Sequence, residues 1–300
     1  MRKKRRGERD LGECIYGAVC RIFIVAFTIL CAYPFYYIFI YSISDPGLAR
    51  TGVWFWPKGF SLETYRQLFE NNDIASAFLI SVARTTIGTA ITIICTAILA
   101  FLVTRKEMVG RKFVYRYTVI TMYISAGMIP WYILMKTYHL DNSFLLYIIP
   151  GAIDAYFMIL MKTYMEQIPE SMEEAAELEG AGFFDILFRI ILPLSKPILA
   201  TCTVYCAVGQ WNRWQDNFFL VRDGKLQTIQ LILYNFLKSA DRIAQSIKNG
   251  AAATAGRTSN ITSQSVQMVA IMVAAIPIML VYPFAQKYFT KGIMMGAVKG

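Results

Sequence analysis

Six long apolar blocks are the feature that most restricts how this chain can fold. They cover residues 21–42, 74–103, 113–135, 143–161, 197–220 and 266–286. Each is close to the length of about 20 residues that a helix needs to cross a bilayer. The blocks lack the alternation of membrane β-barrel strands, and a helix pairs its own backbone groups in lipid. The sequence therefore predicts an all-α membrane protein with six transmembrane helices.

The composition and the placement of charge also indicate a membrane protein. Of the 300 residues, 56% are apolar and 17% are charged, whereas soluble domains contain about 45–50% apolar residues. The net charge of +10 is concentrated beside the apolar blocks, as in MRKKRRGER at the start and RKEMVGRKFVYR at 105–116. A nucleic-acid-binding protein would instead gather basic residues on one folded face. The lipid bilayer is therefore the expected partner, and nucleic acid is not.

Lysine and arginine near the block ends predict the orientation. With six spans, the N-terminal tail, the loop between the second and third blocks and the C-terminal tail lie on one side. The positive-inside rule assigns that side to the cytoplasm. We therefore expect a multi-pass protein of the cell (inner) membrane with both termini cytoplasmic. The residues behind this prediction are Arg2, Lys3, Lys4, Arg5, Arg6, Arg9, Arg105, Lys106, Arg111, Lys112, Lys287, Lys291 and Lys299.

The same pattern predicts how the chain is organised. We expect a basic cytoplasmic tail over residues 1–19, a six-helix membrane domain over 20–290 and a cytoplasmic tail over 291–300. The first block is too long for a cleaved signal-peptide core, and no small-residue cleavage site follows it. Residues 43–73 and 221–265 would then lie on the outer side, the second with a flexible stretch, KNGAAATAGRTSN.

No catalytic or metal-binding constellation stands out in the sequence. Most cysteines fall inside apolar blocks without metal-ligand spacing, which predicts neither disulfides nor zinc. The single histidine, His139, falls in a short polar turn, and a G-x-x-x-x-G-K-[ST] phosphate loop is missing. The chain is therefore expected to be no enzyme and to bind no cofactor or metal. The cysteines are Cys14, Cys20, Cys31, Cys95, Cys202 and Cys206.

The segment between the fourth and fifth blocks, residues 162–196, is longer than a simple connection needs. Ser171 and Glu174 have the spacing of a capping box, which predicts that a helix starts there. Negative charge suits the first turns of a helix. The acids gathered at this position are Glu173, Glu174, Glu177 and Glu179.

A bend and a second short helix are expected to follow. Gly180 and Gly182 permit a sharp change of direction, and Pro193 and Pro197 mark the return into the membrane. Two interpretations remain open from the residues alone: an interfacial hairpin with a solvated acidic face, or a surface shaped for a cytoplasmic partner. The predicted apolar face of the second helix consists of Phe183, Phe184, Ile186, Leu187, Ile190 and Ile191.

This segment resembles the EAA signature of the membrane subunits of binding-protein-dependent ABC importers. The signature reads Glu-Ala-Ala, three residues, Gly, nine residues, Ile, one residue and Leu-Pro. The matching positions are Glu174, Ala175, Ala176, Gly180, Ile190, Leu192 and Pro193. The resemblance implies a coupling loop, about residues 166–193, that docks into a cleft of a cytoplasmic ATPase dimer. Glu174 would contact that dimer, the two alanines would pack closely, and ATP and Mg would bind to the partner.

Two further stretches resemble the carbohydrate-uptake branch, the maltose-type inner-membrane component, and its oligosaccharide and polysaccharide members. They are the C-terminal KYFTKGIMMGAVKG and Trp211-Asn212 near the end of the fifth block. The resemblance covers about residues 20–300, and the basic head and Arg213 depart from it. It implies a second homologous permease subunit and an extracytoplasmic solute-binding protein that delivers the sugar.

Polar residues inside the fourth and fifth blocks are the candidates for a substrate path. Polar groups in hydrocarbon are costly and usually face a cavity or a partner. The stretch GQWNRWQDNFF has two interpretations: tryptophans and amides that contact a sugar, or an aromatic anchor at the outer leaflet. The fourth block carries an aspartate that either pairs with Arg84 or lines the passage. The candidates are Gln210, Trp211, Asn212, Trp214 and Asp154.

The function predicted from these features is that of a permease subunit in an ATP-binding-cassette importer for a carbohydrate, expected to be an oligosaccharide. One alternative is a subunit of an importer for another solute. A second is an ion-coupled secondary transporter, which would need paired repeats and buried ionisable residues at the membrane midplane. A third is an intramembrane enzyme, which would need two convergent catalytic groups.

Overall fold

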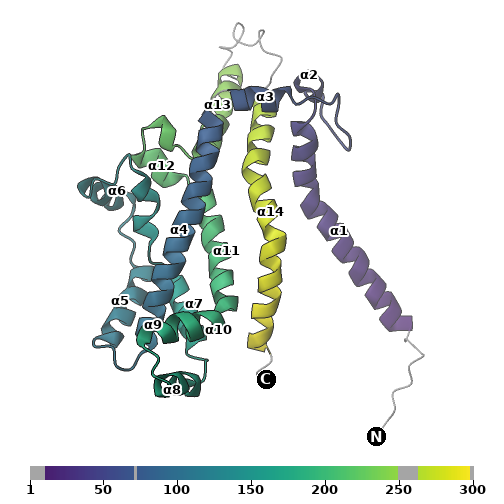
Figure 1. Ribbon diagram of the computed structural model, residues 1–300. Helices are drawn as coiled ribbons and strands as arrows, with labels where there is room; N and C mark the ends of the chain where they lie inside the picture. The colour runs from purple at the N-terminus through teal and green to yellow at the C-terminus, as the bar shows by residue number, and fades with distance from the viewer. Residues whose placement is uncertain (1–10, 71–72, 249–262, 298–300) are drawn as a thin grey trace. The chain divides into compact units, whose positions relative to one another are not determined.

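The computed structural model describes residues 11–70, 73–248 and 263–297, and within these ranges every regular element is a helix (Figure 1). The predicted all-α class is confirmed. A single isolated bridge, Ser44 to Phe60, is the one strand-like pairing in the described part of the chain. The first ten residues of the predicted basic tail, most of the predicted flexible stretch and the last three residues lie outside the described residues.

The described helices range from 3 to 35 residues in length. In order they are α1 (Leu11–Ser42), α2 (Pro46–Ala49), α3 (Glu63–Glu70), α4 (Asp73–Thr104), α5 (Arg111–Tyr123), α6 (Met128–Thr137), η1 (Phe144–Tyr147), η2 (Ile149–Gly151), α7 (Ala155–Met165), α8 (Glu170–Leu178), α9 (Phe183–Asp185), η3 (Ile186–Ile191), α10 (Leu192–Leu194), α11 (Lys196–Asn212), α12 (Gln215–Leu220), η4 (Gly224–Leu226), α13 (Ile229–Lys248) and α14 (Ser263–Ala297).

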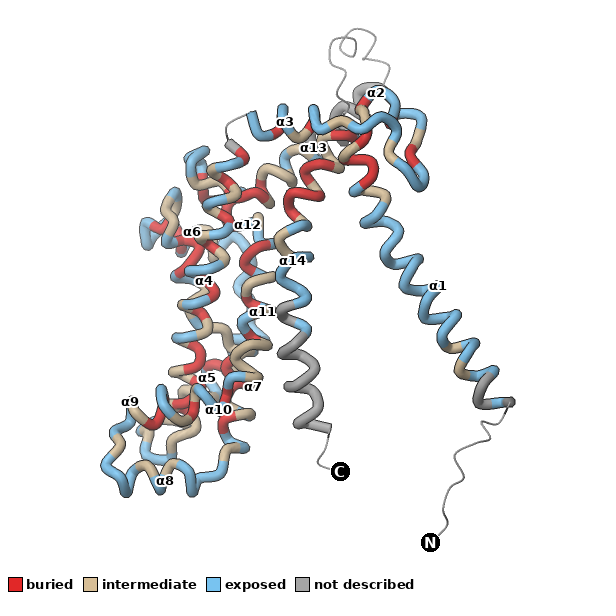
Figure 2. Tube along the Cα trace, turned by 45° about the vertical axis from the view of Figure 1, so that its right-hand side comes forward, coloured by how far each residue is buried: buried red, intermediate tan, exposed pale blue. Residues whose placement is uncertain are grey.

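The chain divides into two compact units. One consists of residues 1–68 and 242–272, and the other of residues 69–241 and 273–300. In the first unit, the end of α1 packs with the α2 segment and with Met268 of α14. Most of α1 is apolar and exposed, with Phe23 69% and Leu30 71% accessible (Figure 2). An exposed apolar helix of this length fits contact with lipid or with another membrane subunit.

Three of the six predicted spans are long, single helices. By length and composition, the helices able to cross a membrane in the described chain contain the stretches Ile15–Ser42, Ile74–Thr104 and Gln264–Pro283. These match the first, second and sixth apolar blocks. Two of these helices extend beyond the apolar blocks that predicted them. Helix α1 begins at Leu11, within the predicted tail, and α14 continues to Ala297.

The other three blocks are broken, so each forms more than one helix instead of a single long one. The fourth block forms η1, η2 and then α7, which is bent by 46° from them and makes a fourth candidate span when the pair counts as one. The third block divides into α5 and α6, with Gly127 at φ +80 just before α6. The fifth divides at Arg213, whose backbone is extended, with φ −76 and ψ 118. Proline and glycine explain the first two breaks.

The core of the second unit lies where α4, α7 and α11 pack together. Ala97 and Ala100 of α4 are buried against Met158 and Met161 of α7, with Cys202 of α11 in the same cluster. Small residues let membrane helices approach closely, and methionine fills the irregular space that remains. This bundle connects the two regions of the unit that carry functional features, the loop at α8–α10 and the polar end of α11.

Candidate functional site

The loop between α7 and α11 has the predicted arrangement of two short helices joined by a glycine bend. Gly180 has φ +83, and an added Cβ there would meet no atom within 4 Å. The amides of Gly180 and Ala181 donate to the carbonyls of Glu177 and Ala176, at 2.9 Å each. This pair of bonds is a Schellman motif, which ends a helix with a residue in the left-handed conformation. Glycine is therefore required by the backbone at position 180.

The start of α8 differs from the prediction. The helix begins at Glu170 after Pro169, with no side-chain cap hydrogen bond. Ser171 therefore lies inside the helix, and the predicted capping box is wrong. The helix starts one residue before Ser171 because Pro169 occupies the N-cap position. Its ring holds φ at −58, and its side chain offers no hydrogen-bond acceptor.

Two of the acids of α8 hold it to the loop between α4 and α5. Glu173 is paired with Arg105, which also lies 4.1 Å over the ring of Phe101. Glu170 accepts from Lys106 Nζ at 2.8 Å, and this hydrogen bond lowers the pKa of Glu170 and raises the pKa of Lys106. Glu170 and Glu173 therefore tether α8 to the α4–α5 loop.

The first residues of the EAA signature and its glycine form much of the outward surface of this loop. Glu174, Ala175 and Gly180 are exposed, and Ala176 is half-buried. Neither a hydrogen bond nor an ion pair of the Glu174 carboxylate occurs among the described residues. Residues free of partners within their own chain are available to a second protein, so the surface has the form that a docking site needs.

The second short helix packs inward, but not with the whole predicted face. It is a π-helix over Ile186–Ile191, in which Ile186, Leu187 and Ile191 are buried against the α4–α7–α11 core. Phe184 is 68% exposed, so it lies outside the buried face expected for it. Ile190 and Leu192 are half-buried, and Pro193 is exposed. The extra residue per turn of a π-helix rotates the face, which sequence periodicity does not foresee.

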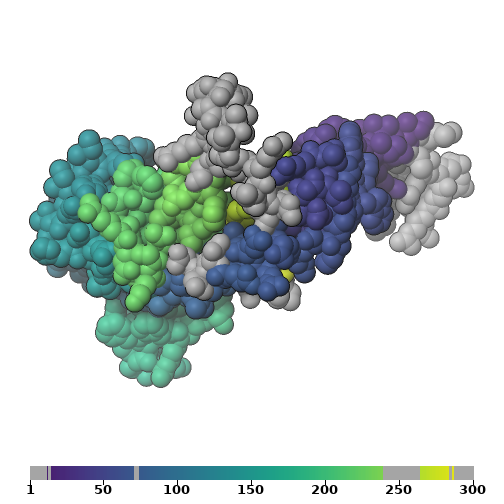
Figure 3. Space-filling view, turned by 90° about the horizontal axis from the view of Figure 1, so that it is seen from above, coloured from purple at the N-terminus to yellow at the C-terminus, as the bar shows by residue number. Residues whose placement is uncertain are grey.

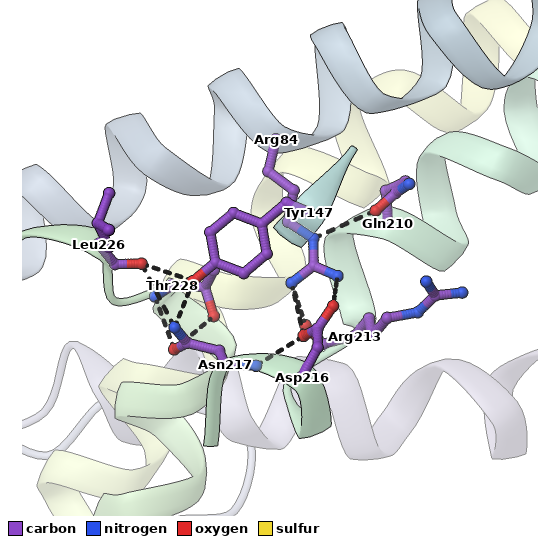
Figure 4. Close-up of polar contacts among 8 residues, drawn as sticks. All are labelled: Arg84, Tyr147, Gln210, Arg213, Asp216, Asn217, Leu226 and Thr228. Atoms are coloured by element: carbon purple, nitrogen blue, oxygen red, sulfur yellow. Dashed lines mark hydrogen bonds and ion pairs between the residues drawn. The ribbon is translucent and has the colours of Figure 1, made fainter. Parts of the chain in front are cut away.

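A buried polar cluster, the Arg84 network, occupies the other end of α11 (Figure 4). The Arg84 side chain is 1% exposed and pairs with both oxygens of Asp216, at 3.0 and 2.5 Å. Its Nε donates to Gln210 Oε1 at 3.2 Å, and one terminal nitrogen donates to the Arg213 carbonyl at 2.9 Å. Such two-pronged pairing fixes geometry as well as charge. Arg84 thereby joins α4 to both sides of the break between α11 and α12.

Asn217 extends the network to the next loop. Its amide nitrogen donates to the Tyr147 hydroxyl and, at 3.3 Å, to the Leu226 carbonyl. Its amide oxygen accepts from the Thr228 backbone nitrogen at 3.2 Å. Seen from above, the green part of the chain, which includes α12, lies beside the teal part, which includes α6 (Figure 3). The network therefore fastens η1, α12 and the start of α13 to one another.

Of the two alternatives for Asp154, the pairing with Arg84 is wrong, and a place along the passage stays a prediction. Asp154 caps α7 by accepting from the Phe157 backbone nitrogen at 2.9 Å, while Arg84 uses Asp216. Sequence reasoning missed this pair, although Asp216 belonged to the polar stretch that it singled out. Position along the chain did not distinguish the two aspartates, since only the packing of α12 against α4 brings Asp216 to the arginine.

The predicted substrate-path residues are placed in two different environments. Trp211 is 6% exposed, donates from its indole nitrogen to the Ala274 carbonyl at 3.0 Å and packs edge-on to Phe78. Gln210 is buried in the Arg84 network. Asn212 is exposed, and Trp214 stacks on Tyr234 with ring centroids 3.9 Å apart. Contact of these residues with a sugar stays a prediction.

A cavity of about 860 Å³ lies beside the Arg84 network, between the break that separates α5 from α6 and the start of α12. Its volume falls within the range of about 300–1,000 Å³ that is usual for small-molecule sites. Arg213, Gln215 and Asp216 form part of its wall, opposite residues of the α5–α6 break. Sequence reasoning did not find it, because the break itself was not foreseen.

Comparisons with known proteins agree with these features. The family described as "Binding-protein-dependent transport system inner membrane component" matches residues 20–213. The chain is 34% identical to the polygalacturonan/rhamnogalacturonan transport system permease protein YtcP of Bacillus subtilis, over 95% of this chain and 97% of that one. It is 26% identical to the melibiose/raffinose/stachyose import permease protein MelC of the same organism, over 93% and 96% of the two chains.

A solved structure is also similar over nearly the whole length. It is a chain of a bacterial ABC transporter involved in the import of the acidic polysaccharide alginate. The TM-score is 0.83 at 27% sequence identity, and the match covers 94% of this chain and 99% of that chain.

Proposed function

Because the chain belongs to the family of binding-protein-dependent transport system inner membrane components, we propose that its cargo is a carbohydrate, specifically an oligosaccharide. In this family the chain is the permease, the membrane-spanning subunit of an ABC importer, and ATP is hydrolysed by a separate subunit. The observation that carries the proposal is full-length similarity to relatives that are named for the import of oligosaccharides and polysaccharides.

The coupling loop, α8 to α10, gives the proposal a mechanism. Glu174 and Ala175 face outward, so they can seat in a cleft of a cytoplasmic ATPase dimer, which binds ATP and Mg. Ion pairs join α8 to the α4–α5 loop, and the π-helix buries Leu187 in the α4–α7–α11 core. A displacement of α8 on ATP-driven closure would therefore move α4 and α11 with it, which changes access to the passage.

The proposal also includes partners and orientation. One bundle of this size does not enclose a passage, so we propose a second homologous permease subunit beside it and an extracytoplasmic binding protein that delivers the sugar. The long exposed apolar surface of α1 fits such a subunit or lipid. We place the coupling loop and both termini in the cytoplasm, because basic residues flank these segments.

The second candidate function is that of an importer of the same class for another solute. It would use the same coupling loop, so only transport measurements separate the two. Membership of the family excludes both an ion-coupled secondary transporter and an intramembrane enzyme.

Reconstitution of the complete transporter tests the proposal. The chain is purified with its ATPase, its second permease subunit and its binding protein, and ATP-dependent uptake of radiolabelled oligosaccharides into proteoliposomes is measured. Glu174→Arg is expected to abolish co-purification with the ATPase and uptake, whereas Glu63→Arg, an exposed acid of α3, is expected to retain both. Intact uptake in Glu174→Arg, or uptake of amino acids or ions but of no carbohydrate, would contradict the proposal.

A further inference from the structure

We infer that the cavity between the α5–α6 break and α12 binds the carboxylate of an acidic sugar, with Arg213 as its counterion. The inference rests on the proposed function, and it names the substrate class more narrowly as a uronate-containing oligosaccharide. Four features of the described chain support it: an arginine without a partner, a neighbouring acid that is already paired, the position of the site near the outer end of the bundle, and the chemistry of the opposite wall.

Arg213 offers a free cation to this cavity. Its backbone carbonyl is held by Arg84 at 2.9 Å, which fixes where the residue sits. Its side chain is exposed, lines the cavity and makes no hydrogen bond or ion pair within the described residues. Figure 4 shows the guanidinium directed away from Asp216, with no contact drawn to it. The backbone is therefore anchored while the charged group stays available.

The acid nearest to Arg213 in sequence cannot serve as its counterion. Both oxygens of Asp216 are taken by Arg84, and one of them also accepts from the Asn217 backbone nitrogen at 2.8 Å. Two arginines and one aspartate therefore leave one positive charge in excess at the cavity wall. An anion that enters this cavity meets that charge without displacing an existing ion pair.

The site lies near the outer end of the bundle, where an arriving cargo can reach it. The 17 residues of α11 separate Arg213 from the coupling-loop end of the bundle, and they rise roughly 25 Å at 1.5 Å per residue. This distance is most of the hydrocarbon thickness of about 30 Å, so Arg213 lies close to the outer boundary of the membrane. The exposed guanidinium can stay hydrated at that level without a counterion from its own chain. A cargo that carries a carboxylate would meet this charge as it enters the passage.

The remaining walls suit a sugar better than a simple ion. Aromatic side chains can lie against the apolar faces of a sugar ring, and hydroxyl and amide groups can bond its hydroxyls. The α6 helix also begins at this wall without a side-chain cap hydrogen bond, which leaves the positive end of its dipole toward the cavity. The lining residues with these properties are Trp131, Phe219, Gln215, Thr121 and Ser125.

The test compares two probes of the same size, trigalacturonate and the neutral galactotriose with the same linkage. Uptake by the complete transporter is measured with binding proteins saturated by each sugar. Arg213→Gln is expected to lower trigalacturonate uptake roughly tenfold or more, the loss typical of a charged hydrogen bond, and to change galactotriose uptake less than about twofold. Arg213→Lys should restore much of the difference, and Arg222→Gln, an exposed arginine away from the cavity, should change neither rate.

Each contrary outcome has a defined meaning. Equal slowing of the uptake of both sugars by Arg213→Gln overturns the inference. Uptake of galactotriose but not of trigalacturonate by the wild-type transporter also overturns it. In both cases the proposed function as a carbohydrate importer stands. Absence of any carbohydrate uptake defeats the proposed function instead. If the effect of Arg213→Gln depends on phosphatidylglycerol rather than phosphatidylcholine vesicles and not on the sugar, the anion is a lipid phosphate and the inference is wrong.

A second measurement serves if Arg213→Gln fails to assemble. In Gln215→Cys, alkylation at position 215 is followed by mass spectrometry in the otherwise unchanged transporter. Trigalacturonate is expected to slow this alkylation severalfold more than galactotriose does. Equal protection by both sugars, or protection by neither, would overturn the inference.

Discussion

The coupling loop and the Arg84 network both use arginine or lysine paired with a carboxylate, but in opposite environments. Lys106 and Glu170 are each 71% exposed, whereas Arg84 and Asp216 are 1% and 6% exposed. Exposed ion pairs contribute little and are screened by salt, while breaking a buried pair leaves an uncompensated charge. The same chemistry therefore makes one region easy to move and the other rigid, which suits the proposed roles of a docking loop and of a frame around a passage.

Removing one member of the buried pair is the strongest way to test this contrast. Asp216→Ala leaves Arg84 unpaired, and we expect a loss of about 3–5 kcal/mol of stability. The measurement is the apparent melting temperature of the transporter in lipid nanodiscs. The double variant Arg84→Met, Asp216→Leu should recover much of the loss, because no buried charge then remains. If Asp216→Ala is as stable as the wild type, water must reach Arg84 and solvate its charge, and the contrast with the exposed pair fails.

A matched pair of glycines tests the hinge of the coupling loop. Gly180→Ala forces a side chain into the left-handed region at φ +83, which costs about 1–2 kcal/mol. Gly182→Ala is the control, since its φ is −77 and an added Cβ meets only Asp185 at 3.9 Å. We expect Gly180→Ala to reduce sugar transported per ATP hydrolysed and Gly182→Ala to leave the ratio unchanged. If both variants transport the same amount of sugar per ATP hydrolysed, the bend at Gly180 takes no part in coupling.

Trp211→Phe separates packing from hydrogen bonding at the rigid end. It keeps an aromatic ring near Phe78 but removes the indole donor to the Ala274 carbonyl. The lost hydrogen bond contributes about 0.5–1.5 kcal/mol. We expect a small fall in melting temperature with assembly retained, and a larger fall for Trp211→Ala. Normal stability with impaired uptake in both variants would instead indicate direct contact with the substrate.

Salt and pH should act on the exposed Lys106–Glu170 pair and not on the buried Arg84–Asp216 pair. The lowered pKa of Glu170 means that its contribution is lost as pH falls through that pKa, and the raised pKa of Lys106 means that its contribution is lost as pH rises through that pKa. The pair is thus fully formed around neutral pH. Raising NaCl to about 1 M should slightly increase hydrogen exchange of α8 amides and leave α12 unchanged. An increase at α12 would contradict the contrast.

Much of the coupling loop was predictable because its features are local. A left-handed glycine, a run of acids and a proline restrict the backbone within a few residues, so the bend at Gly180 followed from the sequence. The start of α8 and the π-helix did not follow, since small differences in local geometry decide them. The Arg84 network was missed for a different reason, because its members are far apart in the sequence and meet only in the folded chain. They are residues 84, 147, 210, 216, 217 and 228.

The sequence by itself determined that this chain is helical and belongs in a membrane, because bilayer thickness and backbone hydrogen bonding act on any apolar segment. It also determined the glycine bend between two short helices, because that feature is local. Only the tertiary structure decided where the third, fourth and fifth blocks break, which aspartate Arg84 meets and that Arg213 stays free beside a cavity. Ion-pair partners and cavities depend on which helices lie next to one another, and hydropathy along one chain does not contain that information.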